Sequence, residues 1–241
     1  MPYNNILSLL KDQSFQPRFW SILINPFFLI RRDLFRNIRA LAPQISGRLL
    51  DFGCGRKPYE NLFSVQEYIG VDIEQTGHDH KNSKIDVYYD GKTLPFADHT
   101  FDSLFFSEVL EHIFNVDEIL SEINRVLKPG AKALITVPFS WNEHEIPFDY
   151  GRYSSFGIIY VLEKHGFEVI ELRKSGHYLR VVFQLLSLYF YECFKFLGRP
   201  GYILSMLFIL PIHLVAVVVT LFLPRNKSLY FNNVILARKR Q

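Results

Sequence analysis

Short, nearly continuous apolar runs recur along the chain and alternate with segments in which apolar residues repeat at helical spacing. Such runs are typical of strands buried on both faces of a sheet, and their alternation with helices is typical of an α/β fold. The pattern predicts strands at residues 49–51, 68–71, 85–88, 101–106, 133–137 and 167–172.

Three segments of the same region have the spacing of amphipathic helices, at residues 33–41, 117–127 and 154–165. The second is the most regular, and the sequence LKPG at its end is expected to stop it. Its predicted buried face consists of Ile119, Leu120, Ile123, Val126 and Leu127.

The stretch LLDFGCGRKPY, residues 49–59, is central to the pattern. It is expected to form a strand that ends in Asp51, a tight turn at Gly53 and Gly55, and the start of a helix. Because glycines lack a Cβ atom, the backbone can turn sharply and a ligand can lie against its N–H groups. A second strand ends in Asp72, at the spacing where a carboxylate meets ribose hydroxyls. The two strands therefore predict a nucleotide cofactor at the loop between them.

The kind of cofactor follows from the glycines. A dinucleotide fingerprint requires a third glycine at the position of Pro58. The stretch instead resembles motif I of the class I S-adenosylmethionine-dependent methyltransferases, acid-x-Gly-x-Gly, in the type 11 group. It departs from the family at Lys57, where the full pattern has a third glycine. The resemblance implies S-adenosylmethionine as the cofactor, bound by Asp51, Gly53, Gly55, Asp72 and Ile73.

Two later motifs extend the resemblance. In the family, an acid four residues before a Leu-Pro-Phe segment approaches the adenine amino group. Asp90, followed by Gly91, has that position in this chain. The alternative is that these two residues form only an Asp-Gly turn. The sequence SEVLEHI, residues 107–113, resembles motif IV. This implies that Ser107 and Glu108 line the methionine half of the cofactor.

The same motif brings His112 near the site of methyl transfer, as the resemblance implies. A carboxylate in this stretch has a physical rationale, because the cofactor carries an ammonium and a sulfonium charge. Glu111 is equally compatible with a solvated helix position.

The segment PFSWNEHEIPFDYGRY, residues 138–153, is expected to be the loop after the fifth strand. It is rich in charged and aromatic residues where loops usually carry Gly, Ser and Asn, a mixture that suits an acceptor pocket. Members of the resembled group often carry a similar stretch. We expect His144 and His112 as candidate proton acceptors, because imidazole titrates near neutral pH. The candidate substrate-binding residues are Trp141, Asp149, Arg152 and Tyr153.

An alternative for this loop is a purely structural role. In that case Asp149 and Arg152 would pair only with each other, within a structured loop.

The longest apolar run, residues 203–223, has no charged residue over a bilayer-spanning length, and residues 181–191 are also uncharged. The resembled fold requires a seventh strand, which residues 229–238 supply. Because the strands before and after the run belong to one sheet, the chain must return to the side that it left. This predicts a membrane-associated helical hairpin at 178–224, with Arg180, Arg225 and Lys227 at a cytoplasmic base. The alternatives are a cap packed on the protein and a dimer interface.

The expected organisation is a doubly wound, seven-stranded Rossmann-like sheet with two additions. The methyltransferase domain covers residues 45–177 and 228–241, the N-terminal helical extension residues 1–44, and the apolar helical insertion residues 178–227. Within the extension, residues 19–30 are apolar and contain Pro26; a lid over the cofactor site and a shallow membrane anchor are equally compatible with them.

Composition adds limits to this picture. The 23 Phe and 13 Tyr among 241 residues exceed what one soluble core needs, and a net charge of +3 does not indicate a nucleic-acid partner. Two cysteines give no disulfide framework and suit a reducing compartment, and residues 1–10 lack the pattern of a cleavable signal peptide. No metal site is expected, since His78, Asp79 and His80 have the composition of a solvated loop.

Together these features predict an S-adenosylmethionine-dependent methyltransferase at the cytoplasmic face of a membrane. Its acceptor is expected to be a small molecule or a lipid-linked molecule, possible examples of the latter being cell-envelope glycans. The alternatives are a nicotinamide-dependent oxidoreductase on a similar fold and a non-catalytic membrane adaptor that retains the cofactor pocket.

Overall fold

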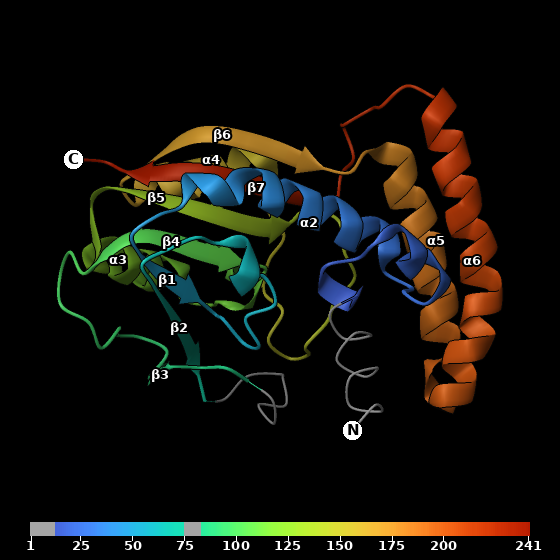
Figure 1. Cartoon of the computed structure of the whole chain (residues 1–241), viewed down its shortest axis with the longest axis horizontal. Helices are drawn as coiled ribbons and strands as arrows, with labels where there is room; N and C mark the ends of the chain where they lie inside the picture. Colours follow the sequence, from blue (N-terminus) through green and yellow to red (C-terminus); the bar gives the residue numbers. More distant parts are fainter. Residues whose placement is uncertain (1–12, 75–82) are drawn as a thin grey trace. The chain divides into compact units, whose positions relative to one another are not determined.

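The computed structural model describes residues 13–74 and 83–241, which fall into two compact units (Figure 1). Among the described residues, the sheet unit comprises 37–74, 83–173 and 232–241, and the helical unit comprises 13–36 and 174–231. His78, Asp79 and His80 lie outside the described residues.

The sheet unit is built on seven strands in the order β3-β2-β1-β4-β5-β7-β6 (Figure 1). Strand β7 runs antiparallel to β5, whereas the pairs from β3 to β5 are parallel. This order confirms the predicted doubly wound sheet. The strands are β1 (Arg48–Phe52), β2 (Glu67–Ile73), β3 (Val87–Tyr89), β4 (Phe101–Ser107), β5 (Leu127–Pro138), β6 (Phe167–Ser175) and β7 (Asn232–Lys239).

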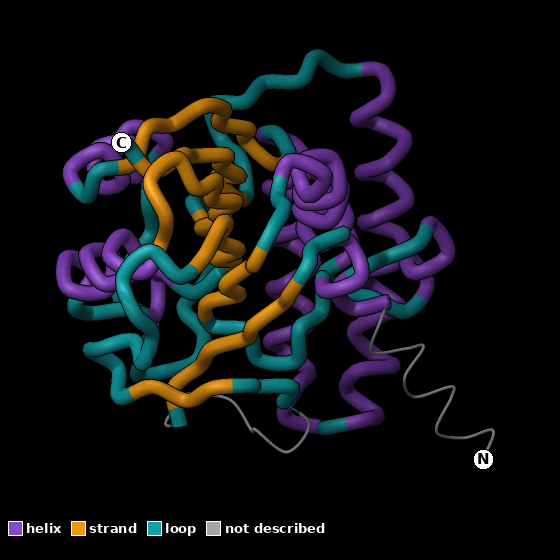
Figure 2. Tube along the Cα trace, turned by 60° about the vertical axis from the view of Figure 1, so that its left-hand side comes forward, coloured by secondary structure: helices purple, strands orange, loops and turns teal. Residues whose placement is uncertain are grey.

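Helices α3 (Val116–Val126) and α4 (Ser155–Lys164) lie on the same face of the sheet (Figure 2). The face of α3 predicted from its apolar spacing is buried, and it shares one core with Ile158 and Leu162 of α4. The Ser154 Oγ accepts a hydrogen bond of 3.1 Å from Gly157 N and so caps α4. Both helices were expected within one residue of their observed ends.

The prediction that a helix begins after the glycine turn is wrong. Between β1 and β2 the chain forms only turns and a short 3-10 helix, Glu60–Leu62. Lys57 has a φ of 51°, which interrupts a right-handed helix, and Pro58 follows it directly. The Lys57 side chain is nevertheless buried, so the turn is packed against the sheet unit although no helix forms.

Strand β5 is also longer than its apolar run indicates. It begins at Leu127, directly after α3, whereas the sequence LKPG predicted a loop before a strand at Ala133. Its pairing with β4 shifts register between Phe101 and Ser103, which accommodates the Lys-Pro-Gly residues as an irregular first part. Strand β3 likewise begins two residues later than expected, at Val87.

The helical unit contains an antiparallel pair, α5 (Tyr178–Phe194) and α6 (Arg199–Phe222) (Figure 1). The chain reverses at Gly198, whose φ is +66°. The two ends of the pair meet, because Tyr178 N donates a hydrogen bond of 2.8 Å to the Asn226 carbonyl. The predicted helical hairpin is therefore present.

The N-terminal part of α2 (Phe28–Leu41) packs with this hairpin inside the helical unit. The buried Gln184 side chain of α5 accepts hydrogen bonds from the N–H groups of Leu29 and Ile30 and donates one to the Pro26 carbonyl. These are N–H groups of the first turn, which have no partner within the helix. Arg180 and Asp33 add an ion pair of 2.7 Å.

Short 3-10 helices also occur among the described residues. Besides Glu60–Leu62, they are Phe19–Leu23, Ala42–Gln44, Leu110–His112 and Lys195–Leu197.

Candidate active site

The candidate site residues lie where the strand order of the sheet reverses. Strand β1 pairs with β2 on one side and with β4 on the other. In open α/β sheets, ligands bind outside the carboxyl ends of the strands at such a switch point. Asp51, Asp72 and Ser107 belong to these three strands, at or near their carboxyl ends.

The two glycines of the turn after β1 have different functions. Gly53 has a φ of +70°, and a Cβ atom added there would lie 2.4 Å from Val109 Cγ2, so the glycine makes room for Val109. Gly55 has a φ of +47° and nothing within 4 Å of its virtual Cβ atom. The turn is therefore closed by protein at Gly53 and open at Gly55, where a ligand can approach the backbone.

Lys57 occupies the position where the resembled family has a third glycine. Its φ of 51° is a left-handed conformation that glycine adopts without strain. Its ammonium pairs with Asp86 and lies 5.2 Å from the centre of the Tyr68 ring. The chain thus keeps the backbone geometry of the glycine and uses the added side chain to brace the turn.

The predicted ribose-binding residue, Asp72, lies beside the open part of the turn. Its Oδ2 accepts a hydrogen bond of 2.9 Å from Gly55 N, and its Oδ1 accepts one of the same length from Ile73 N. A carboxylate at the end of the second strand is the group that meets ribose hydroxyls in nucleotide-binding sheets, so this position beside the open turn suits a ribose.

A hollow of about 550 Å³ lies beyond Asp72, at the carboxyl ends of β2 and β3. Its size is within the usual range for small-molecule and cofactor sites. It is lined by Ile73, Glu74, Tyr88, Tyr89, Asp90 and Gly91. Asp90 also accepts hydrogen bonds from the N–H groups of Lys92 and Thr93, so it forms the Asp-Gly turn that was the alternative to an adenine contact. Because Asp90 also lines the hollow, the two interpretations are compatible.

The acid of the first motif, Asp51, is almost fully buried. Its Oδ2 accepts a hydrogen bond of 2.6 Å from Tyr68 Oη. Burial raises the pKa of Asp51 to about 7, although the bond from Tyr68 and the nearby Lys57 ammonium act in the opposite direction. Desolvation therefore dominates at this position.

Glu108 is held by hydrogen bonds from two strands, β5 and β7. Its Oε1 accepts a hydrogen bond of 2.7 Å from Thr136 Oγ1 and its Oε2 one of 2.6 Å from Asn232 Nδ2. Its φ of 55° is unusual for a non-glycine residue and is typical of functional sites. Ser107 Oγ shares a 2.9 Å hydrogen bond with the same Thr136 hydroxyl.

Thr136 and Asn232 were missed by the sequence analysis. Thr136 lies in a strand that is otherwise an apolar run, and Asn232 is distant from motif IV in the sequence. The paired Asn232-Asn233 in a buried strand was the signal that could have pointed to them, since Asn233 Nδ2 also donates a hydrogen bond of 2.8 Å to the Tyr153 carbonyl.

The loop after β5 is braced by Arg152. Its Nη1 and Nη2 donate to the two oxygens of Asp149 at 2.5 and 2.7 Å, and Nη2 also donates to the Asn142 carbonyl. The pairing that the structural alternative predicted is therefore present. Contact of Trp141, Asp149, Arg152 or Tyr153 with an acceptor stays a prediction.

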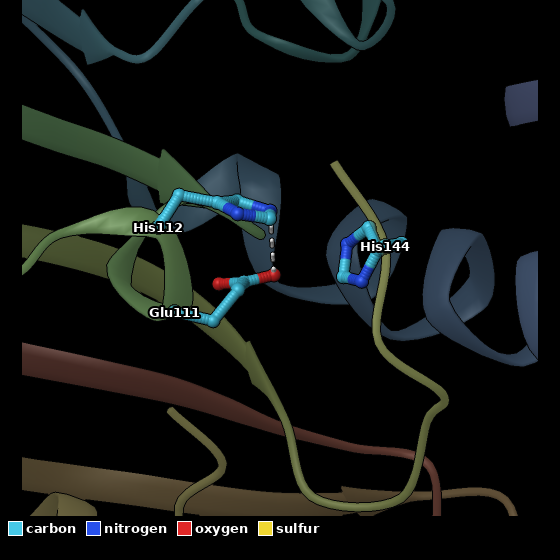
Figure 3. A group of neighbouring side chains, drawn as sticks. All are labelled: Glu111, His112 and His144. Atoms are coloured by element: carbon cyan, nitrogen blue, oxygen red, sulfur yellow. Dashed lines mark ion pairs between the residues drawn. The ribbon is translucent and has the colours of Figure 1, made fainter. Parts of the chain in front are cut away.

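Glu111 and His112 of the 3-10 helix Leu110–His112 meet His144 of the loop after β5 (Figure 3). One ligand atom from each lies within 4.8 Å of the others. Glu111 is fully buried, so the alternative of a solvated helix position is wrong. It belongs to the same 3-10 helix, and its carbonyl accepts a hydrogen bond from Tyr150 N of the overlying loop. Burial, followed by repulsion from Glu108, raises the pKa of Glu111.

Comparison with known proteins identifies this arrangement. Residues 28–172, more than half of the chain, match a family model described as a methyltransferase domain. The chain belongs to the class I S-adenosylmethionine-dependent methyltransferases. This confirms the resemblance found in motifs I and IV and supports S-adenosylmethionine over a nicotinamide cofactor.

The methyltransferase is similar to curated relatives over part of its length. It is 27% identical over 143 residues to a probable S-adenosylmethionine-dependent methyltransferase of Mycolicibacterium smegmatis, covering 56% of this chain and 54% of the relative. It is 35% identical over 103 residues to an uncharacterised protein of Methanocaldococcus jannaschii, covering 42% and 49%. The match thus spans about half the length of these relatives.

Solved structures share the fold. One is from the complex between the Haloferax volcanii Trm112 methyltransferase activator and a putative methyltransferase, with a TM-score of 0.57, 16% identity, and coverage of 96% of this chain and 94% of that one. Another is phosphoethanolamine N-methyltransferase 2 of Haemonchus contortus with S-adenosylmethionine, with a TM-score of 0.53, 21% identity, and coverage of 95% and 59%.

The residues of the methyltransferase fit its family's cofactor. The open face of Gly55, the carboxylate of Asp72 beside it and the hollow lined by Ile73 and Asp90 suit the adenosine part. Glu108 and Ser107 lie at the end of β4, where the resemblance implies the methionine part.

The buried carboxyl of Asp51 predicts an unusual pH dependence for the methyltransferase. The folded-state pKa, about 7, exceeds the unfolded value of 3.8, so the folded state binds the proton more tightly. Stability is therefore lost as pH rises from about 4 to 7, by about 4 kcal/mol in full. Asp51→Asn, which keeps an acceptor for Tyr68, should melt at a higher temperature than wild type at pH 8 and show a smaller difference at pH 5.

The matched control is Asp102→Asn in the same sheet. The hydrogen bond from Lys128 lowers the pKa of Asp102, so this change should reduce stability at pH 8. Thermal denaturation of the cofactor-free protein at both pH values measures the effect, and equal pH dependence in wild type and Asp51→Asn would contradict the assignment.

Proposed function

We propose that this methyltransferase acts on an acceptor presented at a membrane surface, with the α5–α6 hairpin inserted in the lipid. The observation that supports membrane insertion is the outward face of α6. Arg199–Phe222 is the helix in the described part of the chain that is long and apolar enough to cross a membrane, and only 22% of its most apolar 18-residue window is buried.

The distribution of residues around α6 is the reverse of that in a water-soluble helix. Its buried positions are mostly small or polar, whereas its exposed positions are large and apolar. This arrangement is typical of helices that pack against each other in lipid, because small residues let the backbones approach. The buried positions are Gly201, Ser205, Ile209, His213, Ala216 and Thr220, and the exposed ones include Ile203, Leu207, Leu214, Val218, Leu221 and Phe222.

The contact between the helices is close at the tip of the hairpin. A Cβ atom added to Gly201 would lie 1.9 Å from the Phe194 carbonyl oxygen, so only glycine fits there. Phe190 stacks on Phe208 with ring centres 4.8 Å apart. These contacts hold the two helices together, so their apolar outer faces remain available for contact with lipid.

Other parts of the helical unit support the same location. Phe19, Trp20 and Leu23 are exposed, and an aromatic anchor beside basic residues is typical of a membrane interface. Arg225 and Lys227 follow α6 directly at the base of the hairpin. The apolar face is costly in water, since at about 25 cal/mol per Å² each few hundred Å² exposed costs several kcal/mol.

Methyl transfer itself requires mainly alignment. S-adenosylmethionine supplies an electrophilic methyl group on a sulfonium, so the chain must hold the acceptor close and in line and, for a protonated acceptor, take up its proton. His144 and His112 are the candidate proton acceptors. Burial first, and then His112, lower the pKa of His144, so its imidazole is neutral at pH 7 and has a lone pair available.

The membrane proposal is tested by two matched double variants. Leu207→Gln/Leu214→Gln replaces exposed leucines of α6, whereas Phe156→Gln/Tyr160→Gln replaces exposed aromatic residues of α4 in the sheet unit. Glutamine is a good helix former, so both variants should fold. Detergent is removed in the presence of vesicles of phosphatidylcholine and phosphatidylglycerol, and the vesicles are floated through a density gradient. We expect the fraction of protein that floats with the vesicles to be at least about tenfold lower for the α6 variant than for wild type.

The α4 variant should float as wild type does. Affinity for S-adenosylhomocysteine should be unchanged in both variants, which shows that the fold is intact. If wild-type protein remains a soluble monomer with these vesicles, or if both variants lose flotation equally, the membrane proposal is wrong.

A further inference from the structure

The cluster of Glu111, His112 and His144 contains polar groups whose partners are missing. Glu111 is 0% exposed, and neither carboxylate oxygen has a hydrogen-bond partner among the described residues. Burying a carboxyl group without hydrogen bonds costs several kcal/mol, so such groups are rare unless a ligand or ion satisfies them. Its Oε1 lies 3.8 Å from His112 Nε2, which is also buried and lacks a hydrogen bond (Figure 3).

The tautomer of His112 is set by a backbone group. Its Nδ1 lies 2.7 Å from the Phe148 carbonyl oxygen. A carbonyl can only accept, so Nδ1 carries the proton. In a neutral ring Nε2 therefore has a free lone pair, and that lone pair is directed into the cluster beside the Glu111 carboxylate.

His144 is oriented in a similar way. Its Nδ1 lies 3.2 Å from Asp149 Oδ2 and 3.3 Å from the Asn142 carbonyl, both of which accept. The Arg152 guanidinium is slightly farther from the same nitrogen, at 3.4 Å, and is already paired with Asp149. Imidazoles that bind metals are commonly held in this way by a carboxylate or a backbone carbonyl.

We propose that Glu111, His112 and His144 bind one divalent transition-metal ion. Two imidazoles and one carboxylate are a ligand set found for zinc and for non-haem iron, with further positions left for water or substrate. Tetrahedral ligands of zinc are about 3.4 Å apart, so the 4.8 Å limit of the cluster requires only small side-chain movements. Glu145 Oε1, 3.7 Å from His112 Nε2, is the candidate fourth ligand.

This inference does not depend on the proposed function, because the ligands can be occupied whether or not methyl transfer occurs. It does change the expected role of the two histidines. A nitrogen whose lone pair is bound to a metal cannot accept a proton. If the site is occupied, the histidine that binds through this nitrogen is therefore a metal ligand and not a general base.

The test measures metal directly in the full chain. Protein purified without chelators is analysed by inductively coupled plasma mass spectrometry, and metal-free protein is titrated with Zn²⁺ against a competing dye. We expect close to one ion per chain in wild type. Glu111→Gln and His144→Asn should each bind Zn²⁺ at least about 100-fold more weakly than wild type. Loss of a residue that only hydrogen-bonds to a metal ligand already weakens binding by up to about 100-fold, and these variants lose a ligand itself.

The matched control is His99→Asn. His99 lies in the same unit and its Nδ1 is 3.1 Å from the Leu127 carbonyl, and asparagine tolerates its φ of 56°. This variant should bind Zn²⁺ as wild type does. S-adenosylhomocysteine affinity, measured on the same samples, reports the fold and the cofactor site separately. Equal Zn²⁺ affinity in wild type and Glu111→Gln would overturn the metal proposal, whatever the methyl-transfer activity.

Discussion

Replacing His144 by alanine is expected to lower the rate of methyl transfer by about 10² to 10⁴-fold, the contribution of a positioned base. His144 lies beside His112, with ring centres 4.8 Å apart, and Asp149 holds its backbone N–H and its ring. The cofactor residues of the first two strands are elsewhere in the unit, so affinity for S-adenosylhomocysteine should stay unchanged. The measurement is label transfer from methyl-labelled S-adenosylmethionine to a membrane lipid extract, with calorimetry for the cofactor.

A large loss is expected for either role of the imidazole, as proton acceptor or as metal ligand. Treatment of wild type with a chelator separates the roles, because removal of an ion abolishes turnover only where a metal takes part. His99→Asn again serves as the control and should retain full activity. Normal turnover by His144→Ala would remove this residue from the mechanism.

The second large effect is expected at the cofactor site. Asp72→Ala should weaken S-adenosylhomocysteine binding at least tenfold, because hydrogen bonds to a charged group are worth about 1.5 to 3 kcal/mol each. The change removes the ribose acceptor and also the partner of Gly55 N, which fixes the open part of the turn. Isothermal titration calorimetry measures it.

Two further variants separate these contributions. Asp72→Asn keeps an acceptor for Gly55 N and loses the charge, so it should bind with intermediate affinity. Asp98→Ala removes an exposed carboxylate that is paired with Arg125 at 2.8 Å and is not among the residues that line the hollow, so it should bind as wild type does. Unchanged affinity in Asp72→Ala would mean that the ribose lies elsewhere.

The sheet was predictable because its strands are buried on both faces and therefore appear as apolar runs. Strand β4 shows this well, since its predicted start and the observed start coincide at Phe101. Motifs I and IV identified the cofactor because the glycine turn and the end of β4 are each formed by residues that are adjacent in the sequence. The helix expected after the glycine turn is absent, since Lys57 has a left-handed conformation and its side chain pairs with the distant Asp86, which the local sequence does not indicate.

The acceptor side depended on contacts between distant segments. The burial of Glu111 results from the loop of residues 138–153, whose Tyr150 N and Phe148 carbonyl bond to residues 111 and 112. Asn232 reaches Glu108 only because β7 inserts between β5 and β6. A helical periodicity or an apolar run carries no information about such pairings, so the cluster of Glu111, His112 and His144 could not be predicted.

The central claim is that this methyltransferase transfers a methyl group to a membrane-presented acceptor. The most direct measurement is incubation of the protein with methyl-labelled S-adenosylmethionine and vesicles made from native membrane lipids, followed by separation of the organic and aqueous phases. The account predicts label in the organic phase with wild type and with Phe156→Gln/Tyr160→Gln, and a strong loss with His144→Ala and with Leu207→Gln/Leu214→Gln. Label that enters only water-soluble acceptors, equally with both double variants, would contradict it.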